Sequence, residues 1–150
     1  MNKSINHQFF FPNPPKAVWE YLTNSELMDL WLMKNDFQPI VGHEFQFRTG
    51  PKPDYNFDGI VYCKVLEIVP FEKLSYSWKL GPGDGIINID SVVKWELKSK
   101  NEGTELVLEH SDFAIMENLL IFNSMNEGWV KNVHKIIDRL NAASHGTINT

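Results

Sequence analysis

Hydrophobic and polar positions alternate through the middle of the chain, and this pattern predicts an antiparallel sheet. Apolar or aromatic residues fall on every second position in three stretches, at 45–48, 74–79 and 93–98, with charged or polar residues between them, and 105–110 follows the same pattern except at Val107 and His110. Strict alternation is typical of strands with one buried and one solvated face. Glycine- and proline-rich turns separate these stretches, as expected for hairpin connections.

Two further strands are predicted from less regular patterns. Ser4–Phe11 alternates aromatic and polar residues and ends at a cluster of prolines, which favours a first strand. Phe57–Val69 predicts a longer strand, but it carries Lys64 on one face and Glu67 on the other. Alternation alone therefore leaves open which face of this strand is inward.

Apolar residues at helical spacing first appear between the first predicted strand and the alternating stretches. Pro15 suits the first position of a helix, and the apolar residues after it recur at helical spacing to about Leu22. A second short helix is predicted to begin after a cap at Asn24 or Ser25 and to reach Trp31. Two short helices are thus expected between the first strand and the sheet.

The longest periodic segment, Ser124–Asn141, predicts an amphipathic helix near the end of the chain. Ser124 and Glu127 have the spacing of a capping box, in which each side chain satisfies a free backbone amide of the first turn. The apolar positions then follow helical spacing at Trp129, Val133, Ile136, Ile137 and Leu140. Such a one-sided helix must pack on an apolar surface, for which the sheet is the natural partner.

The segment before this helix permits two interpretations. Phe113–Asn123 is rich in apolar residues and could form a helical lead-in or a lid over a cavity, and we favour the helix. Residues 145–150 are expected to form a frayed, flexible end.

Length and composition favour one globular domain over residues 1–150. The formal charge of −5 disfavours nucleic-acid binding, and no apolar run is long enough to insert into a membrane. Cys63 is the sole cysteine, which excludes an internal disulfide, fits a cytoplasmic location and predicts a small buried side chain. Aromatic residues make up 13% of the chain, so a core or a pocket wall must be built from them.

Motifs for metal, cofactor or nucleophilic chemistry are weak. The five histidines have no metal-ligand spacing, and the glycine-rich loop at 81–85 lacks the Lys-Ser/Thr that follows a phosphate-binding loop. We therefore expect no metal and no cofactor. His110 ends an inward-facing stripe and has three open roles: a hydrogen-bonded structural group, a ligand contact, or a general base near Asp112 or Glu109.

The order of elements and several short motifs resemble a known family. The chain is similar to the START-like, helix-grip superfamily, and within it to single-domain relatives of the C-terminal domain of the activator of Hsp90 ATPase. The resemblance covers about residues 5–140 and rests on segments in the family's order: Pro14–Trp19, Leu22-Thr23 and Trp31, Val41–Phe45, Pro70–Leu74 with Trp78, Gly103–Leu106 followed by His110, and Gly128-Trp129. It implies an α+β fold: a curved antiparallel sheet of about six strands, two short helices after the first strand, and a long C-terminal helix across the sheet.

The resemblance also implies a cavity between the sheet and the last helix. An aromatic, largely apolar wall is the usual composition of a small-molecule site. The candidate ligand-binding residues are Trp31, Phe45, Phe47, Phe57, Tyr76, Trp78, Trp95, Leu108, His110, Trp129 and Val133. Further polar groups could come from Gln46, Arg48 and Tyr62, and Gly50–Asn56 could gate the cavity together with Phe113–Asn123.

Three functions follow as hypotheses. The first is a binding protein for a small apolar or aromatic molecule. The second is a co-chaperone-like domain that contacts a chaperone through its surface. The third is a cyclase-like or hydratase-like enzyme, which would need an acid and a base that converge in the cavity.

Overall fold

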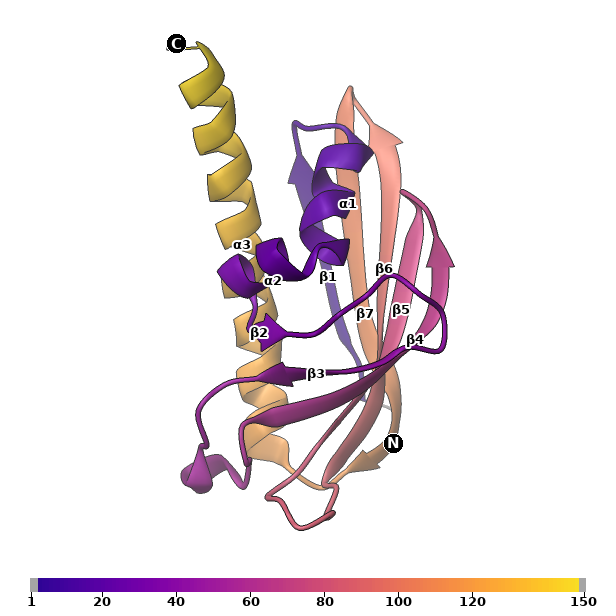
Figure 1. Cartoon of the computed structure of the whole chain (residues 1–150), viewed down its shortest axis with the longest axis vertical. Helices are drawn as coiled ribbons and strands as arrows, with labels where there is room; N and C mark the ends of the chain where they lie inside the picture. Colours follow the sequence, from indigo (N-terminus) through magenta and orange to yellow (C-terminus); the bar gives the residue numbers. More distant parts are fainter. Residues whose placement is uncertain (1–2, 149–150) are drawn as a thin grey trace.

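The computed structural model describes residues 3–148, with side chains described through residue 142. It has the predicted α+β architecture, in which an antiparallel sheet carries helices on one face (Figure 1). The strands are β1 Ile5–Phe11, β2 Lys34–Asn35, β3 Glu44–Arg48, β4 Ile60–Val69, β5 Lys73–Leu80, β6 Ile89–Lys100 and β7 Gly103–Met116. The helices are α1 Pro15–Thr23, α2 Ser25–Trp31 and α3 Leu119–Ile148, with a 3-10 helix η1 at Pro53–Tyr55.

The sheet is a meander closed at one side by the first strand. Its order is β1-β7-β6-β5-β4-β3-β2, and every neighbouring pair is antiparallel. The sheet therefore has seven strands rather than the expected six. The additional strand, β2, is two residues long and pairs through Lys34 and Asn35 with β3, so it is too short to show alternation.

A β-bulge settles the inward face of β4. Val61, Cys63 and Val65 are buried, and burial raises the pKa of the Cys63 thiol. The pairing of β4 with β5 shifts register between Val65 and Glu67. Because a bulge adds one residue to one strand, Lys64 and Glu67 are both exposed although strict alternation would place them on opposite faces.

The two short helices form as the sequence predicts. α1 begins at Pro15, and α2 is capped by Asn24, whose side chain accepts hydrogen bonds from the backbone amides of Glu26 and Leu27 at 2.9 and 3.2 Å. Met28 and Trp31 on α2 are buried. Both helices lie between the C-terminal half of α3 and the sheet (Figure 1).

The start of the last helix differs from the prediction. α3 begins at Leu119, and Asn118 caps it by accepting a hydrogen bond from the Ile121 amide at 3.1 Å. The predicted capping box of Ser124 and Glu127 is therefore wrong, because both residues lie inside the helix. An asparagine before an apolar segment is an equally good cap, and here it takes that role.

The segment Phe113–Asn123 is divided between two elements. Its first part continues β7 to Met116, which pairs with Ile89, and its last part is the first turn of α3. Asp112 adopts a positive φ of 55° next to a register shift in the β6–β7 ladder, so the strand bends and resumes pairing. The favoured helix is wrong for residues 113–116, because β6 begins at Ile89, earlier than expected, and offers them a pairing partner.

The core lies between the inner face of the sheet and α3. Trp129, Val133 and Ile136 are the fully covered residues in the middle of α3, which runs along the sheet from its lower end in Figure 1. The helix continues through Ile148, into the segment expected to be a frayed end. Residues 149–150 of that segment lie outside the described residues.

Candidate functional site

An apolar pocket opens between the first half of α3 and the inner face of the sheet. Its volume is about 220 Å³. Six buried residues from β4, β5, α3 and the segment before β4 form its floor: Phe57, Val61, Trp78, Leu80, Ile121 and Trp129. This composition is typical of a small-molecule site.

The polar lining residues lie at the rim. Thr49, Lys52 and Ser124 are exposed and Asn132 is half-buried, while the half-buried Met33 and Met125 complete the wall. Methionine side chains adapt their shape readily, so this wall can adjust to its contents. The pocket therefore combines a rigid aromatic floor with an adaptable, partly polar mouth.

His110 lies beneath the pocket in a closed hydrogen-bond chain. Trp129 Nε1 donates to His110 Nδ1 at 3.1 Å, and His110 Nε2 lies 2.7 Å from Ser91 Oγ. Since Nδ1 accepts, the neutral ring carries its proton on Nε2 and donates to Ser91. Ser91 Oγ in turn donates to the Trp78 carbonyl oxygen at 3.0 Å.

This chain makes His110 a structural group. The side chain is fully buried, and burial lowers its pKa to about 3. Both ring nitrogens are engaged, so the imidazole has no free lone pair for a ligand proton. Of the three roles open at the sequence level, the geometry favours the hydrogen-bonded structural group.

Tyr76 and Trp95 form a second buried pair. Trp95 Nε1 donates to the Tyr76 hydroxyl oxygen at 3.0 Å. Burial raises the pKa of Tyr76 well above its ordinary value, so the phenol stays protonated. Neither residue lines the pocket.

Trp78 differs from Trp95 and Trp129 in its hydrogen bonding. It is 3% exposed, yet its Nε1 has no hydrogen-bond partner among residues 3–142. Its ring packs against Trp129 with centroids 5.2 Å apart and also forms the pocket wall. A buried indole N–H without a partner is costly.

The predicted cavity residues fall into two groups. Phe57, Trp78 and Trp129 line the pocket. The remaining eight are packed into the core around it: Trp31, Phe45, Phe47, Tyr76, Trp95, Leu108, His110 and Val133. The aromatic stripe is thus mostly core, with one part exposed to a cavity.

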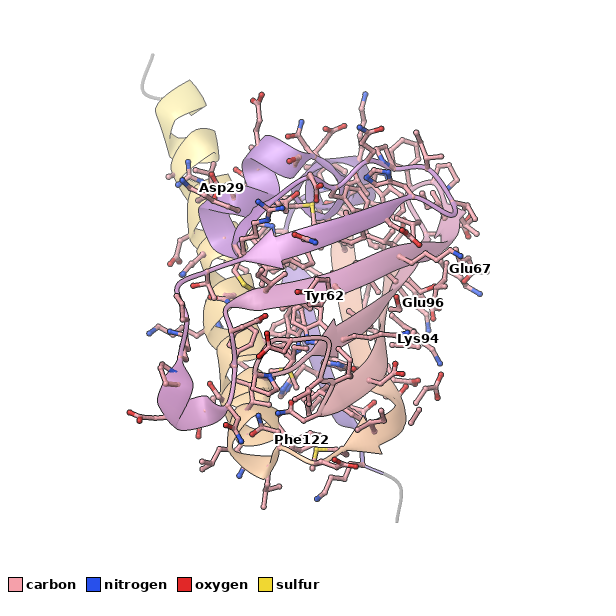
Figure 2. The ribbon with its side chains drawn as sticks, turned by 60° about the horizontal axis from the view of Figure 1, so that its bottom comes forward. Asp29, Tyr62, Glu67, Lys94, Glu96 and Phe122 are labelled. Atoms are coloured by element: carbon pink, nitrogen blue, oxygen red, sulfur yellow. The ribbon has the colours of Figure 1, made fainter. Side chains whose placement is uncertain are left out.

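Three predicted polar contacts lie on the other side of the sheet. Gln46, Arg48 and Tyr62 line a polar hollow of about 500 Å³ on the outer face of β3–β5. Figure 2 shows Tyr62 on this face, which also carries Lys94 and Glu96 of β6. Their side chains are separated from the apolar pocket by the sheet itself.

The acid and base of the enzyme hypothesis are also separated. Asp112 and Glu109 lie 3.1 and 3.3 Å from Lys94 Nζ, and all three are at the surface. The hydrogen bond from Ser111 and that from Lys94 lower the pKa of Glu109, while the bond to Asp112 raises the pKa of Lys94. His110 faces inward instead, so these candidate groups do not converge in the pocket.

The predicted gates meet near the pocket mouth. Asn118 Nδ2 donates to the Tyr55 carbonyl oxygen at 2.7 Å, and Asn88 Nδ2 donates to the Asn56 carbonyl oxygen at 3.2 Å. These bonds tie η1 to the start of α3 and to the segment before β6. Asn118 therefore both caps α3 and holds the Gly50–Asn56 loop in place.

Some pocket residues were not predicted from the sequence. Lys52 and Ser124 reach the rim, and Gly128 on α3 leaves open space where a side chain would lie. The glycine in an otherwise regular helical pattern was a usable signal, because an isolated helical glycine often has a packing or functional reason. Lys52 was predicted only as part of the gating segment Gly50–Asn56 and Ser124 only as a helix cap, because nothing in the sequence places either side chain at a pocket rim.

The described part of the chain also bears on membrane and metal sites. No helix there is long and apolar enough to cross a membrane. Within the same residues, no group of three or more His, Cys, Asp or Glu side chains could hold a metal ion.

The seven-stranded antiparallel sheet and the long helix across it define a START-like, helix-grip protein. The chain belongs to the family described as activator of Hsp90 ATPase homolog 1-like protein, whose model matches residues 12–141. This confirms the family resemblance seen in the sequence. Among curated proteins, none matches the chain significantly.

Solved structures show the same fold. Protein MLL2253 from Mesorhizobium loti is 29% identical, with a TM-score of 0.81 over 93% of this chain and 98% of that one. The Aha1 dimer protein from Colwellia psychrerythraea is 18% identical, with a TM-score of 0.71 over 91% of this chain and 94% of that one. DynU16, from the dynemicin biosynthetic locus, is 18% identical, with a TM-score of 0.74 over 93% of this chain and 48% of its own.

Proposed function

We propose that this protein binds a small, largely apolar molecule in the pocket beneath α3. The observation that carries the proposal is the pocket itself: a cavity of about 220 Å³ with a buried aromatic and aliphatic floor and exposed or half-buried polar residues around it. Each 100 Å² of apolar ligand surface buried there would contribute about 2.5 kcal/mol. We further propose that residues 1–150 act as one cytoplasmic domain.

The contacts divide by depth. Phe57, Trp78 and Trp129 would touch the ligand, and Lys52 and Ser124 would meet any polar end at the rim. The other eight predicted residues, which pack into the core around the pocket, would support this surface from behind. Their role is to hold the aromatic floor rigid, which lowers the ordering cost of binding.

Native mass spectrometry of the protein purified from its own host tests the proposal. We expect a reproducible small-molecule adduct that disappears on denaturation. Gly128→Leu should abolish it, because a Cβ at Gly128 meets nothing within 4 Å and a larger side chain can fill the pocket. Lys131→Leu, on the exposed side of the same helix, is the matched control and should retain the adduct.

Two results would contradict this function. One is a bare protein that also fails to bind apolar probes added at high concentration. The other is an adduct that survives in the folded Gly128→Leu variant, because the molecule would then bind elsewhere.

A second candidate function comes from the family, which is described as activator of Hsp90 ATPase homolog 1-like protein, and from the likeness to the Aha1 protein of Colwellia psychrerythraea. A chaperone ATPase would then be a protein partner of this chain. Stimulation of a purified Hsp90-type ATPase at near-stoichiometric ratios would support it. Unchanged ATPase activity at high micromolar protein would contradict this second function.

A further inference from the structure

Lys52 is the one charged residue among the described residues that line the apolar pocket. The other polar lining residues, Thr49, Ser124 and Asn132, are neutral. Their hydroxyl and amide groups can donate or accept hydrogen bonds, so they are compatible with a ligand group of either charge. Within this lining, Lys52 alone sets a sign of charge, and that sign is positive although the whole chain carries a formal charge of −5.

Backbone contacts fix the position of Lys52 at the mouth of the pocket. Its amide donates to the Phe57 carbonyl oxygen at 2.8 Å, and its carbonyl oxygen accepts from the Phe57 amide at 3.3 Å. Phe57 is buried and belongs to the pocket floor. The helix η1, which follows Lys52, lies beside the start of α3 (Figure 1), where Asn118 donates to the Tyr55 carbonyl oxygen. The position of Lys52 is therefore set from two sides, by the pocket floor and by α3.

The side chain of Lys52 is free to turn toward a ligand. It is exposed, and it forms no ion pair with any described residue, although Asp54 lies two positions further along the chain. Four other lysines do have carboxylate partners: Lys79, Lys94, Lys98 and Lys100. A lysine ammonium is carried on a flexible alkyl stem, so it can meet an acceptor at the mouth while it stays in contact with water.

We infer that the ligand of this pocket is an amphipathic anion, with an apolar body on the aromatic floor and an anionic group at the mouth beside Lys52. The inference rests on the proposed function and narrows it to molecules such as ionised aromatic or aliphatic carboxylic acids. The anionic group would keep part of its hydration at the mouth. An anion placed on the floor would lose its hydration without gaining a cation, so charge decides which end of the ligand enters the pocket.

The pocket volume and this polarity define a matched pair of probes. An apolar cavity of about 150 Å³ accommodates benzene, so one of about 220 Å³ accommodates two fused rings. Naphthoate and naphthamide, both substituted at the same ring carbon, have nearly the same shape, and only naphthoate is charged at neutral pH. The informative quantity is their affinity ratio, because the contribution of the shared rings cancels. Loss of both probes in Gly128→Leu would place their binding in this pocket.

The test removes and then reverses the charge of Lys52. The preference for naphthoate should fall about 2- to 5-fold in Lys52→Met, the effect of one exposed ion pair, and further in Lys52→Glu. Both variants should fold, because the bonds to Phe57 come from the backbone. Lys64→Met and Lys64→Glu are matched controls, since Lys64 is exposed on the outer face of the sheet and does not line this pocket. They should keep the parent ratio.

Salt gives a second measurement. The Debye length falls from about 10 Å at 0.1 M salt to about 3 Å at 1 M, so added salt should reduce the naphthoate preference of the parent protein. The ratio in Lys52→Met should not fall, because the remaining charge of the chain is negative and its screening does not weaken anion binding. A parent ratio that does not fall with salt would contradict an ionic contact at the mouth.

The outcomes separate this inference from the proposed function. If Lys52→Met and Lys52→Glu keep the parent affinity ratio, or if the Lys64 variants lower it equally, the inference is overturned while the pocket stands. If neither probe binds the parent protein, the proposed function fails and the inference with it. A naphthoate preference that declines from the parent to Lys52→Met to Lys52→Glu, but not in the Lys64 variants, supports both.

Discussion

Acid should destabilise this protein through one buried histidine. His110 has an ordinary pKa of 6.5 that burial lowers to about 3 in the folded protein. Because the folded pKa is depressed, the neutral ring contributes its full stability above the unfolded pKa. As the pH falls from about 6.5 to about 3, the unfolded chain takes up a proton that the folded protein does not, and stability is lost.

The magnitude follows from linkage. Each pH unit in this window costs about 1.4 kcal/mol, so the fall from about pH 7.5 to about pH 4.5 should remove about 3 kcal/mol of unfolding free energy through His110 alone. His110→Gln replaces the imidazole with a neutral side chain that still has one acceptor for Trp129 and one donor for Ser91. The variant should lack this part of the acid sensitivity.

The assay is urea unfolding followed by far-ultraviolet circular dichroism, with linear extrapolation at each pH. Carboxylates such as Glu109 titrate in both proteins, so they cancel in the difference between parent and variant. His110→Asn is a second neutral replacement, and it should show the same pH slope as His110→Gln even if its absolute stability differs. Parallel pH profiles for parent and variants would refute the reasoning, because they would mean that His110 takes up its proton equally well in the folded state.

Three further changes have defined outcomes. Gly128→Ala should stabilise the protein by about 0.5 to 1 kcal/mol in chemical unfolding, because the helix loses a flexible residue and the new Cβ has room; a loss of stability would contradict the open space at this position. Trp129→Ala should cost about 3 to 5 kcal/mol in the same assay, because it removes a buried ring in contact with Trp78; a cost below about 1 kcal/mol would show that the ring mainly lines an open cavity. Asn118→Ser should keep the helix cap but release the Tyr55 carbonyl. Amide hydrogen exchange should therefore speed up in Gly50–Asn56 while the start of α3 stays protected. Unchanged exchange in Gly50–Asn56 would show that the Asn118–Tyr55 bond does not hold this loop in place.

Most of the fold could be predicted because its strands repeat a simple period. Alternation placed β3 and β5–β7, and Asn24 and Pro15 marked the two short helices. Two features could not be predicted in this way, because each depends on a pairing partner that is distant in the sequence. The two residues of β2 are a strand only through β3, and residues 113–116 extend β7 only because Ile89 and Asp90 on β6 are there to pair with them.

The site was less predictable than the fold for a physical reason. An aromatic stripe shows that side chains point inward, but it does not show whether their neighbours fill all the space around them. Phe47 and Trp78 belong to the same stripe, yet only Trp78 borders the pocket. The difference depends on α3, where Gly128 lacks the side chain that would otherwise cover this part of the sheet.

The hydrogen bonds of the three central tryptophans connect stability to binding. Trp129 and Trp95 donate their N–H groups to His110 and Tyr76, which fixes both rings. Trp78 is held by packing and by the Ser91 bond to its carbonyl, while its N–H has no partner among the described residues. A hydrogen-bonded aromatic core beside an apolar pocket is the arrangement expected of a preorganised binding site, since rigid rings reduce the cost of ordering.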